Sequence, residues 1–122
     1  MAKKIDIVDG RTALDAVRAA QVSGAKPQRT DLAMAVRYLL QLLDEKAPGN
    51  SVEVRVPPFG AVQVIQGPRH TRGTPPNVVE MDATTWIAVA TGVERWVDAA
   101  SGGRIHASGT RADLSDVLPV RP

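Results

Sequence analysis

The spacing of the apolar residues changes abruptly near residue 50, and this change constrains the fold more than any other feature of the chain. Over residues 31–46 the apolar positions recur every three or four residues, which is the period of a helix that buries one face. From Ser51 onward, valines alternate with charged residues at a spacing of two, as in a half-buried strand. We therefore expect a helical N-terminal part, residues 1–48, and a part with a sheet and short helices, residues 51–122.

Capping and turn residues define the elements on either side of this change. A first helix is expected to begin at Asp9 or Thr12, which are both suitable N-cap residues, and to end at Gly24. Residues 57–60 separate two alternating segments, which predicts an antiparallel hairpin. Residues 67–77 contain two glycines and three prolines, and this composition predicts a loop.

The rest of the chain alternates between short strands and short helices. Asp82 is expected to cap a helix that Gly92 ends. The expected elements after the loop are a strand over 78–80, helices over 83–91 and 94–100, a strand over 104–108 and a helical turn over 113–118. Hairpin-connected strands and grouped helices favour an α+β fold, with a mostly antiparallel sheet of four to five strands covered on one face by helices. At 122 residues the chain is expected to form a single domain.

Composition and motifs argue against several classes of function. The chain has no cysteine, so disulfides, thiolate nucleophiles and cysteine-ligated metals are excluded. His70 and His106 are the only histidines, and no His-Glu-x-x-His, Gly-x-Ser-x-Gly or phosphate-binding glycine pattern occurs. We therefore expect no catalytic residues, no metal site and no cofactor.

The charge distribution and the lengths of the apolar runs bear on partners and location. The net charge is +2, from 15 basic and 13 acidic residues that are interspersed along the chain. Nucleic-acid binders instead gather basic residues with stacking aromatics, so no nucleic-acid partner is expected. No apolar run has the length of a signal peptide or of a membrane span, which predicts a cytoplasmic protein without integral membrane association.

Three stretches of the sequence resemble a known family. The strings over 52–63 and 67–80 and the helix-Gly-helix-Gly-strand pattern over 82–114 are similar to the sterol-carrier-protein-2-like family, in particular to its small stand-alone actinobacterial members. The resemblance implies a sheet of about five strands, helices over one face and an apolar tunnel between them that takes acyl chains or sterols. It also implies relatives in which the module is an accessory to a mycothiol-dependent isomerase domain.

The apolar helix over 31–46 is the first candidate for a ligand site. Only a narrow polar strip of this helix is left to meet water, so the helix is either covered on several sides or lines a cavity. That strip consists of Arg37, Gln41, Asp44 and Glu45.

Five apolar side chains are the candidates for the ligand pocket itself. Leu39, Leu40 and Leu43 are the candidate pocket wall, and Trp86 and Trp96 are its candidate mouth or roof. The alternative, that these five residues only form a close-packed core, remains open.

The loop supplies the polar candidates. Arg69, His70 and Arg72 place up to three positive charges within four residues, and arginine binds carboxylate or phosphate oxygens in a bidentate manner. A fatty acid or an acyl thioester would therefore suit both loop and pocket. Under the alternative interpretation the loop is only surface, with its arginines paired to Glu53 or Glu80.

These observations leave three hypotheses. The first is a non-enzymatic carrier that binds a lipid, acyl chain or sterol-like molecule in an apolar tunnel. The second is an accessory module with a filled core, a homodimer or partner interface, and residues 69–77 as its contact surface. The third, with less support, is an isomerase-related enzyme that binds a small anion at the same loop.

Overall fold

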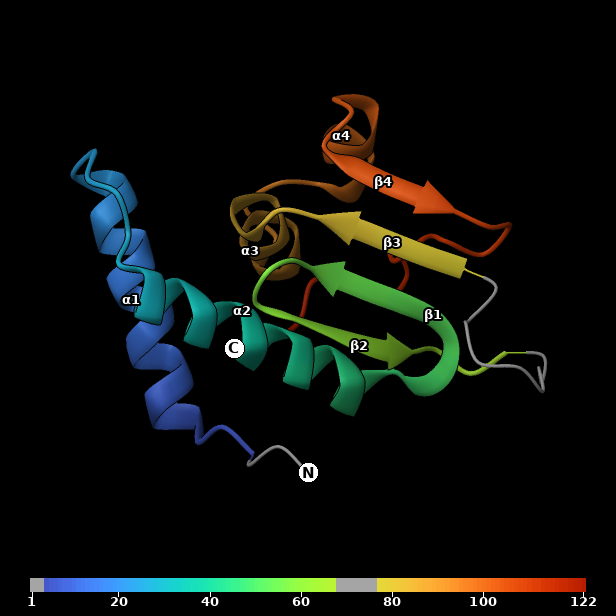
Figure 1. The fold of residues 1–122 in the computed structure, drawn as a ribbon, viewed down its shortest axis with the longest axis horizontal. Coiled ribbons are helices and arrows are strands. Elements are labelled where there is room, and N and C mark those ends of the chain that lie inside the picture. The colour runs from blue at the N-terminus through green and yellow to red at the C-terminus, as the bar shows by residue number, and fades with distance from the viewer. Residues whose placement is uncertain (1–3, 68–76) are drawn as a thin grey trace.

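A mixed four-stranded sheet with helices on one face forms the part of the protein that the computed structural model describes, residues 4–67 and 77–122 (Figure 1). The elements in chain order are α1 (Ile7–Val22), α2 (Arg29–Lys46), β1 (Pro48–Val56), β2 (Gly60–Val64), β3 (Asn77–Met81), α3 (Ala83–Thr91), α4 (Trp96–Ser101) and β4 (Ile105–Ser108). The strand order is β2-β1-β3-β4. The two outer pairs are antiparallel and the central β1–β3 pair is parallel, which confirms the expected α+β class and the mostly antiparallel sheet.

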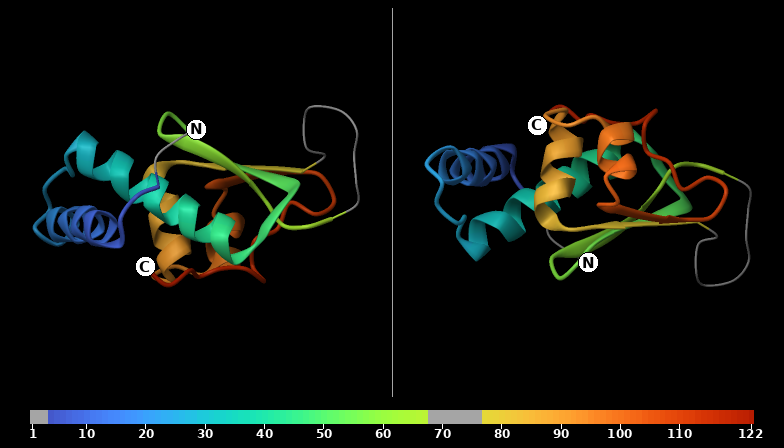
Figure 2. Two further views of the ribbon diagram at one scale, coloured as in Figure 1. Left: turned by 90° about the horizontal axis from the view of Figure 1, so that it is seen from below. Right: turned by 90° about the horizontal axis from the view of Figure 1, so that it is seen from above.

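The alternating strand pattern separates a buried face of the sheet from an open one. Val52, Val54 and Val56 of β1 are fully buried, and Figure 2 shows α2, α3 and α4 on one side of the sheet. The opposite side has no helix in either view of Figure 2. Polar residues occupy that face, as expected for a sheet with one solvated side, and Glu80 pairs there with His106 across the β3–β4 ladder.

Helix α2 and helix α3 supply the largest side chains of the core. Trp86 of α3 is 0% exposed, and its indole Nε1 donates a hydrogen bond to the carbonyl oxygen of Val36 on α2 over 3.2 Å. Leu39 and Leu43 of α2 are also 0% exposed and belong to the same apolar cluster. The core therefore lies between α2, α3 and the inner face of the sheet.

The capping predictions around α3 are confirmed. The Asp82 side chain accepts a hydrogen bond from the Thr85 backbone N–H over 2.8 Å. Gly92 ends the helix with φ of 80°, a left-handed conformation that glycine adopts without steric cost.

Several predicted boundaries were wrong, including the start of α2, at Arg29 rather than residue 31, and the start of β1, at Pro48 rather than Ser51. Helix α1 begins at Ile7 after Asp6, so Asp9 and Thr12 lie inside it, where the Thr12 hydroxyl donates to the Val8 carbonyl over 2.7 Å instead of capping. Helix α4 begins at Trp96 rather than at residue 94. The helical turn expected over 113–118 is a single turn over residues 115–117, where the backbone N–H groups of Val117 and Leu118 both donate to the Leu114 carbonyl oxygen.

Helix α1 lies against α2 at one end of the molecule (Figure 1). The two helices meet through a close contact between Gly10 and Tyr38. A Cβ atom at Gly10 would lie 2.3 Å from Cγ of the Tyr38 ring and 2.4 and 2.6 Å from its two Cδ atoms. Side chains are never that close, so any larger residue at position 10 would push the helices apart or displace the ring. Glycine at this position therefore sets how near the two helices approach.

We expect Gly10→Ala to lower the free energy of unfolding by about 1–3 kcal/mol in urea denaturation, because overpacking against Tyr38 outweighs the gain in helix propensity of about 1 kcal/mol. In a Tyr38→Leu background the same substitution should cost much less, since the flat ring is gone. Equal costs in the two backgrounds would contradict the contact.

Candidate functional site

An open groove lies between α2 and the edge strand β2. It has a volume of about 670 Å³. Helix α2 contributes Thr30, Ala33, Met34, Arg37, Leu40, Gln41, Asp44 and Glu45, the β2 edge contributes Gly60, Ala61 and Val62, and Lys4 and Ile5 close one side. The α2 positions follow helical spacing, so they form one stripe along the outer side of the helix.

The apolar floor of this groove is half-buried and lies beside the core rather than inside it. Ala33 and Met34 are half-buried and pack against the outside of the core cluster. Leu40 is 4% exposed and Val62 is partly buried, so the groove floor reaches the core surface without opening it. The site thus combines an apolar floor with a polar rim, which is the usual make-up of a small-molecule site.

The turn between β1 and β2 is fixed to α2 by two arginines. Arg37 Nε donates to the Phe59 carbonyl oxygen over 2.7 Å, and the Arg29 guanidinium carbon lies 5.3 Å from the centre of the Phe59 ring. The second distance is within the range of a cation–π interaction. These contacts hold the start of β2 beside α2 and so define one wall of the groove.

A second, smaller hollow of about 420 Å³ lies next to the groove. Its lining is Lys4, Ile5, Asp6, Ile7, Tyr38, Gln41, Leu42 and Glu45. Four of these residues also line the groove: Lys4, Ile5, Gln41 and Glu45. The two hollows are therefore neighbours, with the N-terminal segment between them.

Residues 4–6, here called the strap, contact α2 through the side chains of Gln41 and Glu45. The Gln41 amide accepts a hydrogen bond from the Ile5 backbone N–H over 2.8 Å and donates one to the Ile5 carbonyl oxygen over 3.0 Å. Lys4 Nζ lies 3.0 Å from Glu45 Oε2, with side chains 75% and 46% exposed, so solvent screens this ion pair strongly. Gln41 therefore supplies the main polar contact that holds the strap.

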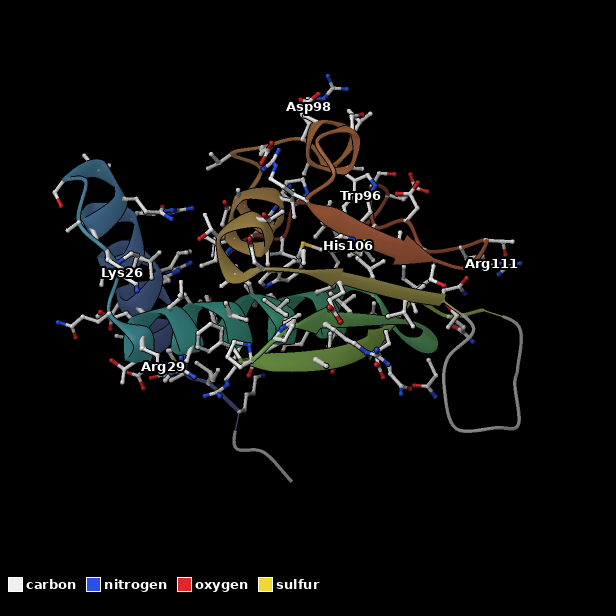
Figure 3. All side chains as sticks on the ribbon, turned by 45° about the horizontal axis from the view of Figure 1, so that its top comes forward. Lys26, Arg29, Trp96, Asp98, His106 and Arg111 are labelled. Atoms are coloured by element: carbon white, nitrogen blue, oxygen red, sulfur yellow. The ribbon has the colours of Figure 1, made fainter. Side chains whose placement is uncertain are left out.

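The structure separates the five apolar residues predicted for the pocket. Leu39, Leu43 and Trp86 lie in the core and line neither of these two hollows. Leu40 lines the groove. Trp96 is half-buried beside α4, and Figure 3 shows it far from Arg29 at the start of α2.

Trp96 lines a separate hollow of about 390 Å³ with Leu118 and Pro119. Glu94 at its rim pairs with Arg104, and the hydrogen bond from that guanidinium holds the pKa of the Glu94 carboxyl below its usual value. Of the five residues predicted to line one pocket, Leu40 and Trp96 thus line different hollows, and Leu39, Leu43 and Trp86 line none of these three.

The polar candidates Arg69, His70 and Arg72 fall outside the described residues. Glu53, which was considered as a partner for these arginines, forms an ion pair with Arg55 on its own strand. The function of the loop therefore stays a prediction.

Sequence reasoning missed the residues that shape the groove. Arg37, Gln41, Asp44 and Glu45 were predicted to meet water, and Arg37, Asp44 and Glu45 are indeed exposed; that this strip also lines an open groove was not predicted. The narrowness of that strip between apolar neighbours was the available signal. No sequence signal predicted the strap, because the contact between Ile5 and Gln41 joins residues that are 36 positions apart in the chain.

Comparison with known proteins assigns the chain to a family. The model of a family described as bacterial SCP ortholog matches residues 28–120, from the start of α2 to just beyond the last described turn. The chain belongs to this family. A search of curated proteins found no match. The SCP-ortholog region thus includes the groove, Tyr38 and Gln41, whereas α1 and the strap precede it.

Two further findings concern this SCP-ortholog chain within its described ranges. None of the helices there is long and apolar enough to cross a membrane. Residues 4–67 and 77–122 also contain no group of three or more histidine, cysteine or acidic side chains placed to hold a metal ion.

Gln41→Ala should release the strap, because it removes both hydrogen bonds to Ile5. We expect the free energy of unfolding to fall by about 1–2 kcal/mol and hydrogen exchange at the Ile5 amide to accelerate, as measured by urea denaturation and NMR. Gln21→Ala, on the exposed face of α1, is the matched control and should change neither. Unchanged exchange at Ile5 in Gln41→Ala would contradict the assigned contact.

Proposed function

We propose that this protein is a non-enzymatic carrier that binds an apolar or amphipathic small molecule, such as a lipid, an acyl chain or a sterol-like compound, in the α2–β2 groove. The groove itself carries the proposal: its volume of about 670 Å³ lies within the range of small-molecule sites, and its floor is apolar. Membership of the bacterial SCP-ortholog family supports the same class of function.

The length of the groove suits a single hydrocarbon chain. From Thr30 to Asp44 the α2 stripe rises about 21 Å at 1.5 Å per residue. One leaflet of a bilayer contributes about 15 Å of hydrocarbon, half of the full core thickness. A single long chain with its polar end therefore fits along the stripe.

The groove is a better site than the interior between helices and sheet. Leu39, Leu43 and Trp86 are fully buried in close packing, and the Trp86 indole is also hydrogen-bonded to α2. A ligand between them would have to displace these contacts and open the core. The groove needs no such rearrangement, so the proposal moves the ligand from the implied tunnel to the outer side of α2.

The groove lining favours binding without chemistry. Its described polar groups are one threonine, one glutamine and the charged ends of Lys4, Arg37, Asp44 and Glu45. No histidine or cysteine occurs among these described lining residues, and those are the side chains that most often act as general base or as thiolate nucleophile. The arrangement supports a carrier rather than an isomerase-related enzyme.

Filling the groove should abolish binding while leaving the core intact. Ala33→Trp places a large ring on the half-buried groove floor, and we expect at least tenfold weaker binding of a pyrene-labelled long-chain alcohol or fatty acid, measured by fluorescence titration. Its control is Ala19→Trp, on the exposed side of α1, which should bind as the unmodified protein does. Melting temperatures of both variants should stay within about 5 °C of that of the unmodified protein.

The titration also separates the carrier from the accessory-module hypothesis. A carrier binds at least one probe with about 1:1 stoichiometry. No uptake of either probe by the unmodified protein, together with no lipid in a solvent extract, would rule the carrier out. Equal binding by Ala33→Trp and Ala19→Trp would leave a carrier but place its ligand elsewhere.

A further inference from the structure

Tyr38 has a hydroxyl group whose position the packing does not explain. The residue is 1% exposed, and its hydroxyl oxygen is buried without a hydrogen-bond partner among the described residues. Buried hydroxyls in folded proteins are nearly always satisfied, because an unmet hydrogen bond is costly. Phenylalanine would supply the same ring against Gly10 without that cost, so the hydroxyl calls for another explanation.

The surroundings of Tyr38 supply an explanation for this buried hydroxyl. Tyr38 lines the smaller hollow together with the apolar residues Ile7 and Leu42 and with the strap. Tyr38 therefore contributes to the lining of a hollow that mixes apolar and polar side chains, while its hydroxyl oxygen stays buried and without a partner among the described residues. A ligand oxygen in this hollow would satisfy it.

The charges around this hollow restrict the kind of oxygen. Among the described lining residues, two are carboxylates, Asp6 and Glu45, and one is an ammonium, that of Lys4. Within that described set Lys4 pairs with Glu45, and the exposed Asp6 has no described partner charge. A carboxylate or phosphate would meet like charge here, whereas an uncharged hydroxyl or carbonyl would not.

We propose that the Tyr38 hydroxyl hydrogen-bonds an uncharged oxygen, a hydroxyl or carbonyl, of the carried molecule, which reaches it when the strap lifts from Gln41. This inference rests on the proposed carrier function. Lys4, Ile5, Gln41 and Glu45 line both hollows, so moving the strap joins the groove to the hollow at Tyr38. The apolar part of the ligand then lies along α2, and its oxygen lies at Tyr38.

The test compares three pyrene-labelled probes of equal chain length that end in an alcohol, a carboxylate or a methyl group. The unmodified protein should bind the alcohol about fivefold to tenfold more tightly than the methyl-ended probe, and more tightly than the carboxylate. Tyr38→Phe should remove the preference for the alcohol and leave the affinity for the methyl-ended probe unchanged. The melting temperature of the ligand-free Tyr38→Phe protein should not fall, because the ring and its contact with Gly10 remain.

The strap has its own readout in the same assay. Gln41→Ala should raise the association rate of the alcohol probe at least twofold in stopped-flow fluorescence, because the strap opens more often. An unchanged association rate in Gln41→Ala would overturn the proposal that the strap covers the hollow at Tyr38.

Each further outcome has a distinct meaning. If the protein binds the probes but Tyr38→Phe keeps the preference for the alcohol, the carrier stands and the role of Tyr38 is overturned. A uniform loss of all three probes with a lower melting temperature gives Tyr38 a structural role only and also overturns the inference. Tighter binding of the carboxylate than of the alcohol contradicts the uncharged oxygen, and no binding of any probe overturns the carrier itself.

Discussion

The packing of α2 on three of its sides is the constraint on which the rest of the structure depends. One side of the helix meets α1, where the Tyr38 ring lies on Gly10. A second side meets α3, where the Trp86 indole donates to the Val36 carbonyl oxygen, and the inward-facing leucines of α2 join the same apolar cluster as the valines of the sheet. Because so much of its surface is buried, α2 holds helices and sheet in one core, and its remaining side is the outer stripe.

That remaining side is where we propose that a small molecule binds. The stripe, the β2 edge and the turn held by Arg37 form a groove whose floor is already apolar, so a hydrocarbon chain would replace water there without disturbing the core. The strap covers part of the stripe through Gln41 and a solvent-exposed ion pair. A firm core beside a weakly held cover is the combination that a carrier needs, since it must load and release its cargo without unfolding.

The sequence predicted the class of the fold and its local signals better than the site. Alternating valines, the Asp82 cap and Gly92 each act within a few residues, so their consequences could be derived from spacing alone. The parallel contact of β1 with β3, and the meeting of Ile5 with Gln41, join segments far apart in the chain, and no local pattern records them. The polar strip of α2 was correctly predicted to face solvent, but its place in a groove could not be predicted, because the edge strand and the strap that lie beside it come from other parts of the chain.

The most direct test of an outer groove beside a closed core is an NMR titration of isotope-labelled protein with an unlabelled long-chain alcohol. Amide shifts should concentrate at Ala33, Met34 and residues 60–62, while the indole Nε1–H signal of Trp86, which reports the core, stays in place. Large movement of that indole signal with little change along the α2–β2 groove would contradict the account and place the ligand inside the core.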